Sequence, residues 1–63
     1  MEESISASEA VRRLCRAGMA FDYRHGMDML KERAVWTRVN MVTVASVDDM
    51  IHYGIRHYPS TDF

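Results

Sequence analysis

The residues nearest to a metal-binding or acid–base pattern lie in the C-terminal part of the chain, at Asp48, Asp49, His52 and His57. On a helix, an aspartate and a histidine three or four residues apart share a face, and such a pair can bind a divalent metal. His52 and His57 are five residues apart and would lie on different sides, so a third ligand would have to come from elsewhere. Aspartates also stabilise the positive end of a helix dipole. We therefore interpret the two aspartates as part of a helix start and expect no metal site.

Cys15 is the only cysteine, and with His25 it could form a nucleophile and base pair. Its spacing from Val11 and Leu14, however, places it on the apolar stripe of a helix, where a free cysteine packs as a small hydrophobic residue. The chain also lacks a glycine-rich phosphate loop, a Gly-x-Ser-x-Gly motif and a paired-cysteine zinc motif. We therefore expect a protein that is not an enzyme and uses no cofactor.

Basic residues are concentrated in one part of a chain whose formal net charge is only −1. Residues 10–38 contain seven of the eight Lys and Arg residues but only three acids. Such a cluster can bind nucleic acid phosphates, although a solvated face with neighbouring acids produces the same pattern. One function that we keep open is therefore a dimeric DNA-binding transcriptional regulator that uses a basic first helix. Its contacts would come from Arg12, Arg13 and Arg16.

The segment 43–56 has a weak helix-turn-helix character, with Ser46 at the start of a recognition helix. The residues exposed near that start would be Asp48 and Asp49, which repel phosphates. This segment is therefore a poor candidate for reading bases.

A further open function is the binding of a small anionic ligand at a dimer interface. Its contacts would come from Arg24, His25 and Arg33. We rank this function last because the sequence indicates no convergent polar pocket.

The elements that would position these residues begin with a helix. Ser6 and Glu9 form a Ser-x-x-Glu capping box, which predicts a helix start. The apolar periodicity continues to about Ala17, and Gly18 suits the left-handed conformation that ends many helices. Residues 1–5 are expected to form a loose tail.

The middle of the chain predicts a strand, a short helix and a second strand. Residues 19–24 alternate in a period of two, which favours a short strand, and the His-Gly pair at 25–26 indicates a turn. Residues 27–33 are rich in good helix formers. β-Branched and aromatic residues then dominate, and they predict one long strand over residues 35–44.

The last element is predicted to be a helix. Ser46 and Asp49 resemble a second capping box, with Asp in place of Glu, so we expect a helix from Val47 to about His57. Pro59 would end it, because the residue before a proline is pushed out of the α region. Residues 60–63 are expected to form a second loose tail.

Together these elements predict a small α+β protein, a single domain over residues 1–63 with α-β-α-β-α order and a short antiparallel sheet. The main alternative is an all-α three-helix bundle, because residues 28–45 can also be drawn as one long helix. The chain has no apolar run of about 18 residues that could span a membrane. With a single cysteine and no secretory signal at its start, it is expected to be cytoplasmic.

A long strand needs a pairing partner, and a 63-residue chain has few places to supply one, so we expect a homodimer. Trp36 would belong to the core if its face of the strand is buried, which we favour, and to an interface if the face is exposed. The surplus of large apolar residues, without a catalytic group, favours a surface for another protein.

Our first hypothesis is therefore a non-enzymatic protein-binding module, an accessory regulator or inhibitor of the kind that phages also encode. It would act by occluding a site on its partner. The binding surface would consist of Trp36, Arg38 and Met29, flanked by the arginines of the first helix.

Overall fold

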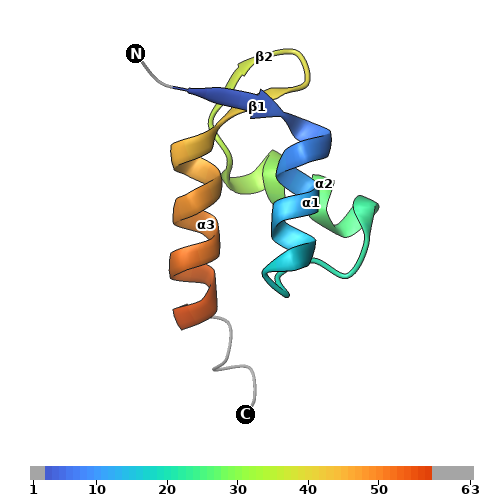
Figure 1. Ribbon diagram of the computed structural model, residues 1–63, viewed down its shortest axis with the longest axis vertical. Helices are drawn as coiled ribbons and strands as arrows, with labels where there is room; N and C mark the ends of the chain where they lie inside the picture. Colours follow the sequence, from blue (N-terminus) through green and yellow to red (C-terminus); the bar gives the residue numbers. More distant parts are fainter. Residues whose placement is uncertain (1–2, 58–63) are drawn as a thin grey trace.

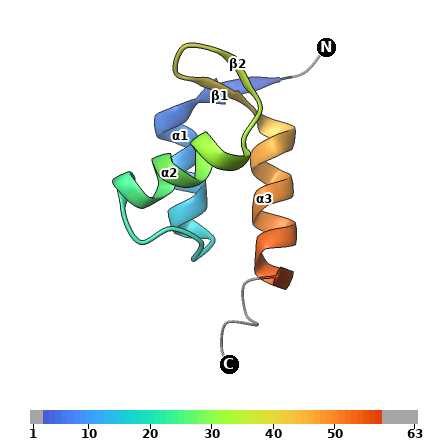
Figure 2. The ribbon, with the colours of Figure 1, turned by 180° about the vertical axis from the view of Figure 1, so that it is seen from behind.

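The computed structural model describes residues 3–57, so the helix end expected at Pro59 and the tail over residues 60–63 lie outside the described residues. Within this range the chain forms three helices and a three-stranded antiparallel sheet, which confirms the predicted α+β class; the all-α alternative is wrong. In chain order the elements are β1 (Ser4–Ser6), α1 (Ala7–Arg16), α2 (Tyr23–Arg33), β2 (Trp36–Arg38), β3 (Met41–Thr43) and α3 (Val44–His57). Figure 1 shows the sheet at one end, with α1 and α3 extending from it, and Figure 2 shows α2 lying across α1.

β3 lies at the centre of the sheet, whose strand order is β1-β3-β2. β1 pairs with β3 in a register that places Ile5 opposite Val42, and Trp36 of β2 lies opposite the same valine. The expectation of a loose tail over residues 1–5 is wrong for Ser4 and Ile5, because the edge of β3 supplies partners for their backbone groups.

The predicted long strand over residues 35–44 is instead a hairpin of two short strands with a turn at Val39 and Asn40. Asn40 has a φ of 62°, and asparagine adopts this left-handed conformation more readily than most residues with a Cβ atom. Because the run folds back on itself, β3 is paired on both edges within one chain. The argument that the strand needs a second copy of the chain therefore loses its basis, and homodimer formation stays a prediction.

α1 follows the sequence-based prediction at both ends. Ser6 ends β1 and caps α1, where its Oγ accepts a hydrogen bond from the backbone N–H of Glu9 at 3.1 Å. At the other end Gly18 has a φ of 79°, and the N–H of Met19 donates to the carbonyl of Leu14 at 2.9 Å. This Schellman motif satisfies carbonyls that a helix end otherwise leaves without partners.

α2 begins earlier than predicted, so the expected strand over residues 19–24 and the turn after it are wrong. Asp22 caps the helix, because its Oδ1 accepts a hydrogen bond from the backbone N–H of His25 at 2.9 Å. Gly26 is then inside the helix and buried against α1. A Cβ atom at Gly26 would lie 2.7 Å from Cγ1 of Val11, so only glycine lets the two helices approach this closely.

α3 also begins earlier than predicted, at Val44 directly after β3. Thr43 caps its first turn, because Oγ1 of Thr43 accepts a hydrogen bond from the N–H of Ser46 at 3.2 Å. The expected capping box of Ser46 and Asp49 is wrong, because Ser46 is already helical. The hydroxyl of Ser46 instead donates to the carbonyl of Thr43 and accepts from the N–H of Val35, which ties α3 to the segment before β2.

The core draws apolar side chains from all three helices, from β3 and from the connection between α1 and α2. Its buried members are Ala7, Ala10, Val11, Leu14, Met19, Ala20, Met29, Leu30, Val42, Val47 and Met50. Trp36 packs against this cluster half-buried, and its Nε1 donates to the carbonyl of Leu30 at 3.1 Å. Trp36 therefore joins β2 to the end of α2, in agreement with the preference for a core position.

Candidate nucleic-acid interface

α1 and α2 form a packed pair of helices connected by residues 17–22. α2 lies across α1 (Figure 2), and the contact of Gly26 with Val11 holds the two axes close together. This local arrangement is a helix, a turn and a second helix, in a part of the chain where the sequence predicted a strand.

The β2–β3 hairpin follows directly after α2. A backbone hydrogen bond of 2.8 Å from the N–H of Ala7 to the carbonyl of Asn40 fastens its turn to the start of α1. The turn of the hairpin and the N-terminal end of α2 both lie on the side of the molecule away from α3 (Figures 1 and 2). A partner on that side can therefore contact both.

The face of α2 that is turned away from the core carries Arg24, Asp28 and Lys31. The opposite face is buried at Gly26 and Leu30. The three charged side chains are exposed, and none of them forms an ion pair within the described part of the chain. The outward face of α2 thus carries two exposed cations with one carboxylate between them.

An aromatic pair stands at the N-terminal end of α2. Phe21 is 91% exposed, and its ring stacks on that of His25 with centroids 4.9 Å apart and planes inclined by 19°. The backbone N–H of Phe21 donates to Nδ1 of His25 at 3.0 Å. Tyr23, in the first turn, is also exposed. The pair is therefore fixed by the same short segment that caps the helix.

One charged and one apolar residue are exposed beside each other at the turn of the hairpin. Arg38 is exposed at the end of β2, and within residues 3–53 it has no acidic partner. Val39 beside it is 83% exposed. The hairpin therefore adds one cation to the side of the molecule on which α2 begins.

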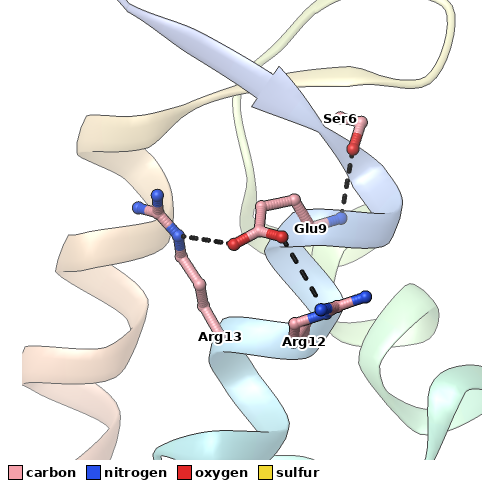
Figure 3. A network of polar contacts seen from close by, with 4 residues as sticks. All are labelled: Ser6, Glu9, Arg12 and Arg13. Carbon is pink, nitrogen blue, oxygen red and sulfur yellow. Dashed lines mark hydrogen bonds and ion pairs between the residues drawn. The ribbon is translucent and has the colours of Figure 1, made fainter.

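The arginines of α1 are less available than the cations of α2. Oε2 of Glu9 lies 3.5 Å from Nε of Arg13, and Oε1 of Glu9 lies 3.9 Å from Nε of Arg12, so one carboxylate contacts both groups (Figure 3). Arg16 is exposed in the last turn, where the negative end of the helix dipole stabilises a cation. The predicted basic helix is present, and its single carboxylate, that of Glu9, contacts two of its three arginines.

The predicted protein-binding surface does not come together as one exposed face. Met29 is 7% exposed and belongs to the core, so the expectation that it is exposed is wrong. Trp36 is half-buried, and its polar atom is already bonded to the carbonyl of Leu30. Of the three central residues, Arg38 alone is exposed. Occlusion of a partner protein stays a prediction, and fewer of the residues predicted for its binding surface are exposed.

The three residues predicted to meet an anionic ligand are also separated. Arg24 and Arg33 lie at opposite ends of α2, about 13 Å apart along the helix axis at a rise of 1.5 Å per residue. His25 is half-buried and engages Phe21 through Nδ1. One chain therefore does not gather these groups around a small anion.

Other candidate groups are solvent-facing. Cys15 is exposed, so the expected inward position is wrong; the buried stripe of α1 runs through Ala7, Val11 and Leu14. Asp48, Asp49 and His52 are exposed on α3. Within the described range, no three His, Cys, Asp or Glu side chains are grouped so that they could hold a metal ion.

None of the helices in residues 3–57 has the length and apolar character needed to cross a membrane.

Sequence reasoning missed the two ends of the exposed α2 face. The sequence predicts Phe21 to lie in a strand, and it distinguishes Lys31 only as one of the basic residues within 10–38. The signal that could have revealed them is Asp22, because aspartate is a favoured N-cap residue. Its Oδ1 accepts a hydrogen bond from the N–H of His25, and the helix therefore starts four residues before the predicted start.

No protein-family model matches the chain, and neither the curated proteins nor the solved structures include one with significant similarity to it.

Proposed function

We propose that the protein binds duplex DNA, with α2 in the major groove. The observation that carries the proposal is the outward face of α2, whose charged side chains are not engaged by the rest of the described chain. In helix-turn-helix proteins the first helix crosses the DNA backbone, and the N-terminal residues of the second contact base edges. The chain order of α1, α2 and the β2–β3 hairpin is a helix, a turn and a helix followed by a hairpin, which is a likeness of arrangement and supports the function by analogy.

The chemistry of the exposed side chains fits a DNA groove. Arg24 and Lys31 can bind phosphates or the O6 and N7 acceptors of guanine, whereas Asp28 between them can accept from the N4 amino group of cytosine. Arg38, on the hairpin, can contact a neighbouring phosphate. A carboxylate among cations opposes non-specific attraction, so this face is better suited to a preferred sequence than to any duplex.

The small size of the domain sets an expectation for affinity. A single module of this kind buries roughly 600–1,000 Å² on DNA, so one copy should bind modestly. Two copies on half-sites one helical turn apart would strengthen binding, because the second contact becomes intramolecular. The predicted homodimer would serve this purpose.

Fluorescence anisotropy of a labelled duplex of about 20 base pairs, drawn from a random-sequence pool, tests the proposal with the full chain. We expect binding at low salt. If three cations contact phosphates, affinity should fall by about 40-fold between 50 and 200 mM salt, because counterions are released on binding. Absence of binding at 50 mM salt would overturn the proposal, and protein occlusion would become the leading hypothesis.

Matched charge variants locate the interface. The double variant Arg24→Gln with Lys31→Gln should weaken binding and flatten its salt dependence, because two contacts to phosphate are lost. Asp28→Asn should tighten binding to random duplex, because it removes a repulsive charge from the same face. Asp48→Asn, an equal change of charge on α3, should leave binding nearly unaltered and serves as the control.

The alternative indicated by the sequence, DNA binding through a basic first helix, predicts the opposite ranking of charge variants. If α1 provides the main contact, Arg12→Gln with Arg16→Gln should weaken binding more than the α2 double variant does. That ranking would move the interface from α2 to α1 while leaving DNA binding intact.

A further inference from the structure

The side chain of Phe21 is unusual because it is large, apolar and almost wholly exposed, yet held in one place. Phe21 is 91% exposed, so it contributes little to the core of the described chain. One face of the ring stacks on His25, with ring centroids 4.9 Å apart. The other face and the ring edge remain open to a partner.

Two hydrogen bonds hold this aromatic pair against the start of α2. The N–H of Phe21 donates to Nδ1 of His25 at 3.0 Å, and Oδ1 of Asp22 accepts from the N–H of His25 at 2.9 Å. Because Nδ1 is an acceptor, the neutral ring carries its hydrogen on Nε2. The two hydrogen bonds thus join the two ends of the segment 21–25. The ring of Phe21 therefore loses little conformational freedom when it binds a ligand.

We propose that Phe21 determines sequence specificity by packing against the C5 methyl group of a thymine in the major groove. This inference rests on the proposed function, because it requires α2 to lie in that groove. The N-terminal residues of the second helix are the ones that reach base edges, and Phe21 directly precedes the capping residue of α2. In the major groove, the thymine methyl is the apolar group that a base pair presents, and phenylalanine is one of the side chains that contacts it.

The surroundings of Phe21 agree with this role. Arg24 and the first turn of α2 can hold the neighbouring phosphate or guanine while the ring covers the methyl group. His25 is a positioning residue, because it contacts the ring of Phe21 and not the base. Tyr53, an exposed aromatic residue on α3, lies on another element and provides a matched control for aromatic exposure alone.

The test begins with a duplex selected from a random pool by the full chain. Each thymine of the selected duplex is then replaced in turn by deoxyuridine, which removes the methyl group and preserves base pairing. At one position we expect the affinity of the wild-type chain to fall by about fourfold, the value expected for one buried methyl group. The Phe21→Ala variant should bind the thymine and deoxyuridine duplexes equally, whereas Phe21→Leu should retain part of the preference.

Controls separate specificity from folding. The melting temperature of Phe21→Ala should equal that of the wild type, because the ring is exposed, and Tyr53→Ala should keep the full preference for thymine. His25→Ala should reduce the preference without abolishing it, because the ring of Phe21 loses its support.

Several results would overturn the inference while leaving DNA binding intact. They are a selection that recovers no preferred sequence, an affinity unchanged by every deoxyuridine substitution, and a thymine preference that survives in Phe21→Ala. Failure of the wild-type chain to bind any duplex at low salt would instead overturn the proposed function, and with it this inference.

Discussion

α1 and α2 each carry three cationic residues, but the two helices differ in how those charges are used. In α1, Glu9 contacts Arg12 and Arg13, and the apolar stripe is buried against the rest of the chain. In α2, Arg24 and Lys31 are exposed without an ion pair in the described chain. Two arginines of α1 are thus in ion pairs, whereas Arg24 and Lys31 of α2 are not, and the proposed function assigns the contact with DNA to α2 on that difference. A count of basic residues along the sequence does not reveal this difference.

The largest expected effect comes from removal of the most buried large side chain of α1. Leu14 is 0% exposed, so Leu14→Ala should lower the free energy of unfolding by about 2–5 kcal/mol, through lost burial and the cavity that remains. Urea denaturation followed by circular dichroism measures this change. Arg24→Ala on the outward face of α2 is the control and should change stability by less than about 0.5 kcal/mol. Equal effects of the two variants would contradict the comparison.

The contact between the two helices gives the next largest effect. Gly26→Ala should destabilise the protein by about 1–3 kcal/mol, because the added Cβ would meet the branched side chain of Val11 at 2.7 Å. A double-mutant cycle with Val11→Ala provides the control, since shortening that side chain removes the clash. The double variant should be less destabilised than the sum of the single variants. Simple additivity would mean that the helices are not in this close contact.

The end of α1 should show a smaller effect. Gly18 has a φ of 79°, and nothing lies within 4 Å of where a Cβ would stand, so the cost of Gly18→Ala is one of backbone conformation alone. We expect a loss of about 1–2 kcal/mol in the free energy of unfolding. Gly18→Asn should lose less, because asparagine tolerates the left-handed region, and thermal melts of the two variants can be compared directly.

The smallest expected effect concerns the ion pairs of α1. Glu9→Gln should reduce stability by only a few tenths of a kcal/mol, because the pairs with Arg12 and Arg13 are exposed to solvent. If α2 is the DNA-binding helix, this variant should change duplex affinity little. A clear rise in affinity would show that the released arginines of α1 reach the phosphates, and the distinction between the two helices would disappear.

The sequence located α1 better than the candidate interface. The limits of α1 were predictable because side-chain and backbone bonds within a few residues set them, at Ser6 and at Gly18. Its apolar stripe was only partly predictable, since Cys15 lies beside the stripe that is actually buried. In α2 the inward face is set by packing against α1 and the core, so Gly26, Met29 and Leu30 are buried and Arg24 is exposed.

The helix-turn-helix predicted over residues 43–56 is wrong. Residues 43–56 have a capping serine and charged residues in the expected positions, but residues 44–57 are the single helix α3. The pair α1 and α2 takes the helix-turn-helix arrangement because Gly26 lets them pack closely, a contact between residues distant in the chain. Such a contact leaves no periodic signal, and the glycine was interpreted as part of a turn.

By itself, the sequence determined the α+β composition, the position and caps of α1 and the presence of a helix in the C-terminal part of the chain. These features depend on interactions between residues close together, which amino-acid type and spacing encode directly. The tertiary structure alone decided that residues 35–44 form a hairpin, that Ser4 and Ile5 pair with β3, and that α2 turns its cations outward. The physical reason is that strand pairing and the choice of a helix's buried face depend on partners supplied from elsewhere in the chain.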